Sequence, residues 1–168
     1  MLAKPDLDGE CPGSSKPFSV KPNLRLGYEI STDVFELQLA GVDSAGTAKT
    51  IAVALRESLA SCLGVASDEM GFAVEDRKGA LGHRYSLFLF DKSSGGAGFA
   101  IQAQDLLADV LREAAILLDC RVPGCVSGCP ACVLVAGLSD ADTLNLNRKG
   151  ALKIVQQLSL ETAPLLED

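Results

Sequence analysis

The chain has 168 residues, of which 48% are hydrophobic, so it can form one domain whose core needs no disulfide support. Its formal net charge of −7 argues against strong, independent binding of DNA or RNA, because such binding draws much of its affinity from a basic face. The sequence shows no signal peptide and no apolar run long enough to span a membrane, which predicts a cytoplasmic protein without membrane contact.

The whole chain divides into two regions. Residues 1–23 are rich in Pro, Gly, Ser and Lys, which is typical of a flexible segment, and residues 24–168 are predicted to form a single domain. Leu26–Ile30 and Val34–Leu39 are rich in apolar and β-favouring residues, and the second segment alternates apolar with polar side chains. We expect one long strand or two short strands here, with one face buried.

Helices and strands are predicted in turn along the rest of the chain. Ser44–Gly64 has apolar residues at helical spacing and ends in glycine, so it is predicted to be a helix. Met70–Glu75 and Arg84–Phe90 are predicted strands, and the apolar character of both faces of the second places it at the centre of a sheet. Helices are expected at Phe99–Leu118 and Leu146–Leu158. This order predicts an α/β fold, with α+β as the alternative, in which helices pack on a small sheet.

Four cysteines lie between the last two predicted helices. Cys120, Cys125, Cys129 and Cys132 are separated by four, three and two residues, with glycines and prolines between them. A tetrahedral zinc site needs four donors about 2.3 Å from the ion, and glycine and proline favour the tight turns that bring such donors together. Because four thiolates leave no open coordination position, the sequence predicts one structural zinc ion. Cys62, within the first helix, is instead expected in the core.

Other interpretations of the cysteines stay open. The last three match the spacing of radical-SAM enzymes, but those enzymes place the motif early in a long barrel, whereas only 36 residues follow Cys132. A four-cysteine iron–sulfur cluster in a non-radical role uses the same ligands as zinc. The remaining interpretation is four free, buried cysteines that bind no metal.

A glycine-rich loop follows the predicted central strand. Gly95, Gly96 and Gly98 lie just before a predicted helix, where backbone amides can hold the phosphate of a nucleotide or of a nucleic acid. The loop lacks the Gly-Lys-Ser/Thr ending of a P-loop. The alternative is a tight turn in which Asp91 accepts hydrogen bonds from the amides of the loop.

Basic residues near the cysteines are further candidates for contact with an anion or a nucleic acid. Arg121 lies between the first two cysteines, and Arg148 and Lys149 open the last predicted helix. Such residues could form a basic patch on an otherwise acidic protein. Ordinary solvated charge is the alternative interpretation.

Several motifs occur together in an order that resembles a known family. They are Leu26–Val34, Leu87–Asp91, Gly95–Gly98 and the Gly-Cys-Pro-Ala-Cys sequence of residues 128–132. The segment from about Leu24 to Leu158 is similar to the C-terminal zinc-binding (MZB) domain of the MrfA-type DNA-repair helicases. The same domain occurs in the helicase-associated subunit of DISARM phage-defence systems.

This resemblance implies a zinc site formed by the four cysteines, in a domain that works with a superfamily-2 DNA helicase. The chain departs from the family pattern at two points. It contains neither a P-loop nor a DEAD/DEAH-type motif, so the resemblance implies a helicase subunit in trans, or in cis if the chain is a fragment. The typical Asp-Arg pair after the cysteines appears here as Asn147-Arg148.

The sequence therefore favours a non-catalytic, zinc-binding accessory domain or subunit of a DNA helicase or translocase complex, in phage defence or DNA repair. Such a domain would dock a partner and make weak DNA contacts. One alternative is a nuclease-like or nucleotide-hydrolysing domain that uses Asp91 and the glycine loop, together with Asp33. The other is a pure protein-interaction module.

Overall fold

Three antiparallel strands form a sheet in a computed structural model that describes residues 27–42, 44–79 and 82–162. The predicted flexible segment, residues 1–23, lies outside the described residues. In chain order the elements are β1 (Val34–Ala40), α1 (Ala45–Leu63), a 3-10 turn (Ser67–Glu69), β2 (Met70–Gly79), β3 (Gly82–Asp91), α2 (Phe99–Gln102), α3 (Leu107–Leu118), α4 (Asp140–Leu144) and α5 (Arg148–Glu161).

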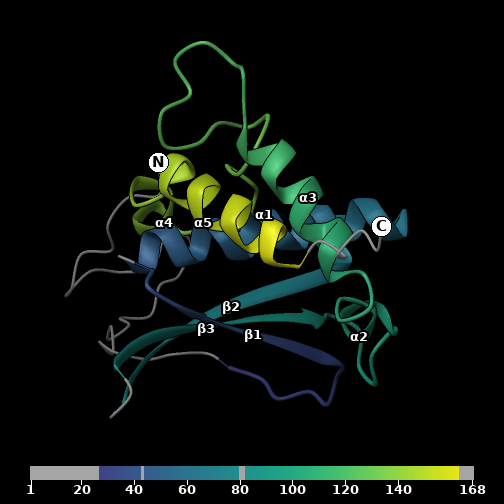
Figure 1. Cartoon of the computed structure of the whole chain (residues 1–168). Coiled ribbons are helices and arrows are strands. Elements are labelled where there is room, and N and C mark those ends of the chain that lie inside the picture. The colour runs from purple at the N-terminus through teal and green to yellow at the C-terminus, as the bar shows by residue number, and fades with distance from the viewer. Residues whose placement is uncertain (1–26, 43, 80–81, 163–168) are drawn as a thin grey trace, which may run out of the picture.

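The sheet has the strand order β1-β3-β2, so the predicted central position of the third strand is confirmed. Leu87 pairs with Leu37 on one side and with Val74 on the other. Leu87 and Leu89 are buried on the face that the helices cover. Figure 1 shows α1, α3 and α5 together on one side of the sheet. The predicted mixed fold is therefore confirmed, and its antiparallel sheet corresponds to the α+β alternative.

Helix α1 is the central element of the core, and local signals fix both of its ends. The Ser44 hydroxyl accepts a hydrogen bond from the amide of Thr47 at the start of the helix. Gly64 ends the helix with φ of 69°, a left-handed conformation that glycine adopts without strain. The core side chains of α1, which contact the sheet on one side and α3 and α5 on the other, include Ile51, Leu55 and Leu59.

Two predictions in this part of the chain were wrong. The long helix expected at Phe99–Leu118 is broken into α2 and α3, because the chain changes direction after α2 contacts β1 and β3, and α3 then packs on α1 and α5. Cys62 is exposed near the end of α1, so it does not belong to the core. Among the described residues, no helix has the length and apolar character needed to cross a membrane.

Candidate metal centre

The Sγ atoms of four cysteines lie close together just after α3. The Sγ atoms of Cys120 and Cys129 are 3.7 Å apart, those of Cys125 and Cys132 are 3.7 Å apart, and those of Cys129 and Cys132 are 3.8 Å apart. All four sulfurs lie within 4.8 Å of one another. A tetrahedron with metal–sulfur bonds of about 2.3 Å has edges of about 3.8 Å. The cysteines are therefore positioned to hold one metal ion.

Two tight turns bring the sulfurs together. The amide of Cys125 donates to the carbonyl of Val122 at 3.1 Å, and the amide of Cys132 donates to the carbonyl of Cys129 at 2.9 Å. The first turn contains Gly124, whose φ of 79° favours glycine. We call residues 120–133 the knuckle.

The knuckle is anchored to the helical core at its second end. Cys132 is 5% exposed and Val133 is completely buried. A Cβ atom at Gly128 would lie 2.9 Å from the side chain of Val133 and 3.3 Å from that of Leu146, so a larger residue cannot fit without movement. The position of the sulfurs thus depends on the packing of the core.

Three thiols of the knuckle have pKa values shifted from the ordinary value of a cysteine. Burial raises the pKa of the Cys125 thiol to about 12 and also raises the pKa of the Cys132 thiol. A backbone hydrogen bond from Ala131 lowers the pKa of Cys129. The amide of Cys129 donates to Sγ of Cys132 at 3.2 Å, a contact that stabilises thiolate. A bound cation supplies the positive charge that four clustered thiolates require.

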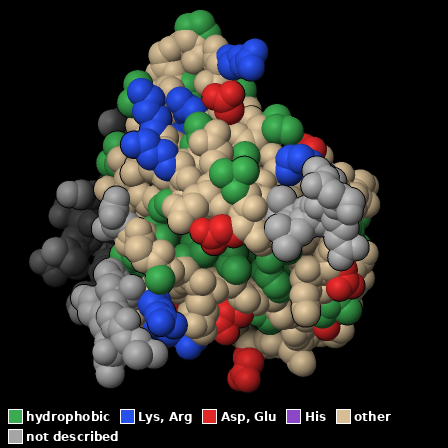
Figure 2. All heavy atoms as spheres, viewed as in Figure 1, with side chains coloured by type: hydrophobic (Ala, Val, Ile, Leu, Met, Phe, Trp, Pro, Cys, Tyr) green, Lys and Arg blue, Asp and Glu red, His purple; other side chains and the backbone are tan. Residues whose placement is uncertain are grey.

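The structure separates the basic residues that the sequence grouped together. Arg121 and Lys149 are exposed, whereas Arg148 is 6% exposed and its guanidinium donates to the carbonyls of Leu118 and Cys125. Figure 2 shows Lys and Arg side chains gathered over the start of α5 and the adjoining loop. The side chain of Arg148 therefore does not belong to an accessible basic surface.

The amides of the glycine loop already have acceptors within the chain. Asp91 is completely buried, and its carboxylate accepts hydrogen bonds from the three backbone amides of Ala97, Phe99 and Ala100 at 2.6, 3.1 and 2.9 Å. The backbone amides of the three glycines also donate hydrogen bonds: Gly95 to the carbonyl of Ser31, Gly96 to the carbonyl of Ser93, and Gly98 to Oδ2 of Asp33. The geometry favours a tight turn held by carboxylates, because an anion would find these amides occupied.

The family model described as "MZB: MrfA Zn-binding domain" matches residues 51–133, a range that contains all four clustered cysteines. The chain carries an MrfA Zn-binding domain. The resemblance drawn from the sequence motifs is therefore confirmed. The match covers α1 from Ile51 onward, β2, β3, α2, α3 and the knuckle, whereas β1, α4 and α5 lie outside it.

A solved structure shares the fold. It is the crystal structure of the DUF1998 helicase MrfA bound to DNA, with a TM-score of 0.55 and 19% sequence identity. The match covers 85% of this chain but only 19% of the helicase chain, so this chain corresponds to about a fifth of the length of that protein. No curated protein sequence matches the chain.

Proposed function

We propose that this chain is a structural zinc-binding, non-catalytic accessory domain that works with a DNA helicase. The observation that carries the proposal is the set of four cysteine sulfurs, within 4.8 Å of one another, inside an MrfA Zn-binding domain. Zinc bound by four thiolates has a closed coordination sphere, so it cross-links the knuckle and leaves no position for an activated water. The metal would hold the knuckle in a fixed shape against the end of α3.

The short distances between the sulfurs support zinc over a cluster of several irons. Sγ–Sγ distances of 3.7 to 3.8 Å suit thiolates that share one central ion. A multi-iron cluster would hold its cysteines farther apart, because iron and sulfide atoms lie between them. Elemental analysis of the purified chain should find one zinc per chain and no iron. Equimolar iron with visible absorbance would overturn the assignment to zinc.

The helicase partner is proposed from the extent of the structural match. The similar structure is a helicase of which this chain matches 19%, and the sequence itself contains no helicase motifs. The helicase domains would therefore lie either on a longer form of this chain, in cis, or on a separate subunit, in trans. Affinity purification from the native host should recover a superfamily-2 helicase. Recovery with no helicase or nucleic-acid-processing protein would contradict the proposal, and the Cys129→Ser variant tests whether an intact knuckle is needed.

The pathway requires a separate measurement. We propose phage defence or DNA repair, the two settings in which the family resemblance places such domains. Loss of the gene should reduce either resistance to phage infection or survival after DNA damage. An unchanged host in both assays would contradict this part of the proposal.

A weak DNA contact is proposed at the basic surface beside the knuckle. Arg121 in the knuckle and Lys149 at the start of α5 are both exposed, and the structurally similar helicase is bound to DNA. Replacing both residues by glutamate should weaken binding of single- and double-stranded DNA at low salt, with a smaller salt dependence. Arg77→Glu on β2 is the control for one such charge reversal, because Figure 1 places the sheet on the far side of the helices. Equal losses for single reversals at Arg77 and Lys149 would contradict a localised contact.

A further inference from the structure

A buried arginine connects the last helix to the end of α3 and to the knuckle. Arg148 is the first residue of α5, and its side chain is 6% exposed. Its Nη1 donates to the carbonyl of Leu118, the last residue of α3, and its Nη2 donates to the carbonyl of Cys125 at 3.0 Å. The carbonyl of Leu118 lies at the C-terminus of α3, where carbonyls lack partners within the helix and a nearby positive charge is favourable.

The backbone of the same residue makes a third connection. The amide of Arg148 donates to the carbonyl of Ser127 at 3.0 Å. Arg148 therefore contacts three points of the chain: Leu118 before the knuckle, Cys125 and Ser127. Its planar guanidinium can reach two carbonyls at fixed relative positions, which a lysine ammonium cannot reproduce.

The preceding residue, Asn147, fixes the position of this arginine. Its side chain caps α5 by accepting the amide of Gly150 at 3.0 Å. Its side-chain amide also donates to the hydroxyl of Thr47 at 2.9 Å, and its backbone amide donates to that of Thr50 at 2.9 Å. Helix α1 thus fixes the start of α5, and with it the origin of the Arg148 side chain.

The charge of Arg148 has no carboxylate partner among the described residues. The ion pairs found there involve Lys49, Arg56, Arg77 and Arg112, and Nε of Arg148 is buried without a hydrogen-bond partner. An arginine side chain stays charged in proteins, and a buried, uncompensated charge is strongly destabilising. Four thiolates around one divalent ion carry a net negative charge, which would supply the missing compensation beside Cys125.

We infer that Arg148 is a positioning residue of the metal centre. It ties the end of α3 to the Cys125 turn, and its charge offsets the negative charge of the four thiolates. This inference rests on the proposed metal binding. It predicts that metal affinity depends on Arg148 although the side chain is not a ligand.

The experiment measures Zn²⁺ and Co²⁺ affinity by competition with a chromophoric chelator, for the whole chain at fixed pH. Arg148→Met should weaken metal binding by about 10–100-fold, the loss typical of residues that support metal ligands. Arg148→Lys, which keeps the charge but not the fork, should be intermediate and should alter the visible spectrum of bound Co²⁺. Lys149→Met is the matched control, because it removes the same charge from an exposed neighbour and should leave the affinity unchanged.

Melting temperatures of metal-free and metal-loaded forms separate this role from a general contribution to folding. A purely structural residue would lower both temperatures equally and leave metal affinity unchanged, which would overturn the inference. An equal loss of affinity in Lys149→Met would also overturn it. If Arg148→Met does not fold, Arg148→Lys decides, and wild-type affinity in that variant overturns the inference. A wild-type chain that binds no metal would instead contradict the proposed function.

Discussion

Each of the four knuckle cysteines contributes one of the sulfurs around a single point, so the loss of one sulfur should affect metal binding and folding together. We predict that Cys129→Ser lowers zinc content and thermal stability in parallel, because a serine hydroxyl does not replace a thiolate ligand. Elemental analysis and thermal denaturation measure the two effects. Cys62→Ser is the control, since Cys62 is exposed and lies outside the cluster. Full retention of zinc and stability in Cys129→Ser would contradict the assignment.

Asp91 offers a second test at the scale of a single residue. Its buried carboxylate accepts the amides of Ala97, Phe99 and Ala100, so Asp91→Ala would leave three donors without their acceptor. We predict a loss of about 2–4 kcal/mol in the free energy of unfolding, measured by urea denaturation. Asp105→Ala, at an exposed position, should cost little by comparison.

The same residue distinguishes the accessory function from an enzymatic one. In a nuclease or nucleotide hydrolase built on Asp91, Asp91→Asn would abolish activity while the chain stayed folded. We expect the folded Asp91→Asn variant to support the helicase complex as the wild type does, because the carboxylate is buried and occupied by backbone amides. Loss of activity in that variant at unchanged stability would favour the enzymatic alternative.

The sequence predicted the cysteine cluster of the knuckle, but it did not predict that Arg148 is buried. Four cysteines separated by two to four residues form a local sequence pattern, and the glycine and proline residues between them strengthen it. Arg148 lies next to the exposed Lys149 in sequence, and its burial depends on the carbonyls of Leu118 and Cys125, which are 30 and 23 residues away. No local pattern distinguishes two adjacent basic residues of which only one faces the core.

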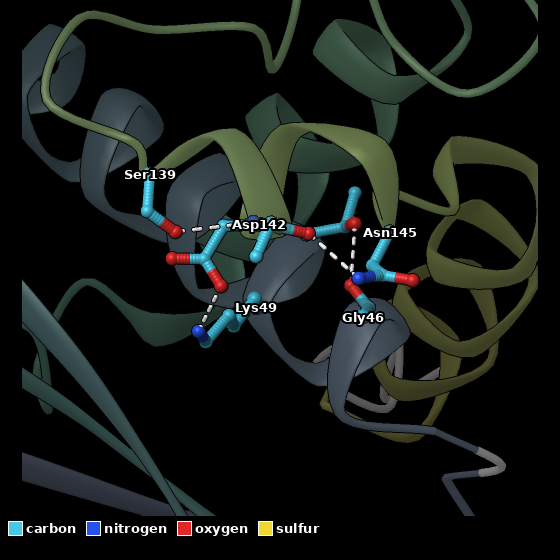
Figure 3. Close-up of polar contacts among 7 residues, drawn as sticks. Gly46, Lys49, Ser139, Asp142 and Asn145 are labelled. Carbon is cyan, nitrogen blue, oxygen red and sulfur yellow. Dashed lines mark hydrogen bonds and ion pairs between the residues drawn. The ribbon is translucent and has the colours of Figure 1, made fainter. Parts of the chain in front are cut away.

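At the scale of elements, the contact between α1 and α4 is a polar clasp shown in Figure 3. Lys49 on α1 forms an ion pair with Asp142 on α4, and the Ser139 hydroxyl accepts the amide of Asp142 at 3.2 Å. Gly46 allows α1 to approach the start of the α4–α5 connection, because a Cβ atom there would lie 1.9 Å from the carbonyl oxygen of Asn145. The clasp therefore holds the segment that leads from the knuckle to α5.

We predict a pH-dependent effect of breaking this clasp. The hydrogen bond from Lys49 holds the pKa of Asp142 below its ordinary value of 3.8. A carboxyl group with a lowered folded-state pKa stabilises the fold above its unfolded-state pKa and loses this contribution as the pH falls through the folded-state pKa. Asp142→Asn should therefore cost about 0.5–1 kcal/mol at pH 7, a small value because both side chains are partly solvated.

Urea denaturation at two pH values measures this effect. The difference between Asp142→Asn and the wild type should shrink as the pH falls below 3.8 and through the lowered folded-state pKa of Asp142, because the carboxyl group then becomes protonated in the folded state too. High salt at pH 7 should also reduce it. A pH-independent difference would show that lost packing, and not the ion pair, accounts for the effect.

The ends of α1 could be predicted from the sequence, whereas the break before α3 could not. Ser44 and Gly64 act through bonds to residues within five positions, so the signals are local. The break at residues 103–106 places the buried Ala103 against the core, and nothing in the apolar spacing of Phe99–Leu118 separates one bent helix from two. Packing on β3 and α1, which are distant in sequence, decides the direction of the chain there.

At the scale of the whole molecule, the knuckle lies at one side of the helical layer and the sheet lies at the other, as Figure 1 shows. The central position of β3 followed from the apolar pattern of its sequence, although the helices cover only one face of the sheet. The role of the knuckle in joining α3 to α5 did not, since it arises from contacts of Cys132, Val133 and Arg148 with residues of other elements.

This arrangement predicts a graded response to metal removal. Chelation should lower the melting temperature and increase hydrogen exchange most in residues 118–133 and at the start of α5, because the proposed metal would cross-link the knuckle and Arg148 connects it to α3. The centre of α1 and strand β3 should stay better protected, since Ile51, Leu55 and Leu87 are buried among sheet and helix side chains. Added zinc should restore the original pattern, and Cys129→Ser should show the increased exchange without chelator. Uniform loss of protection across the sheet and the knuckle would mean instead that the metal is required for the whole fold.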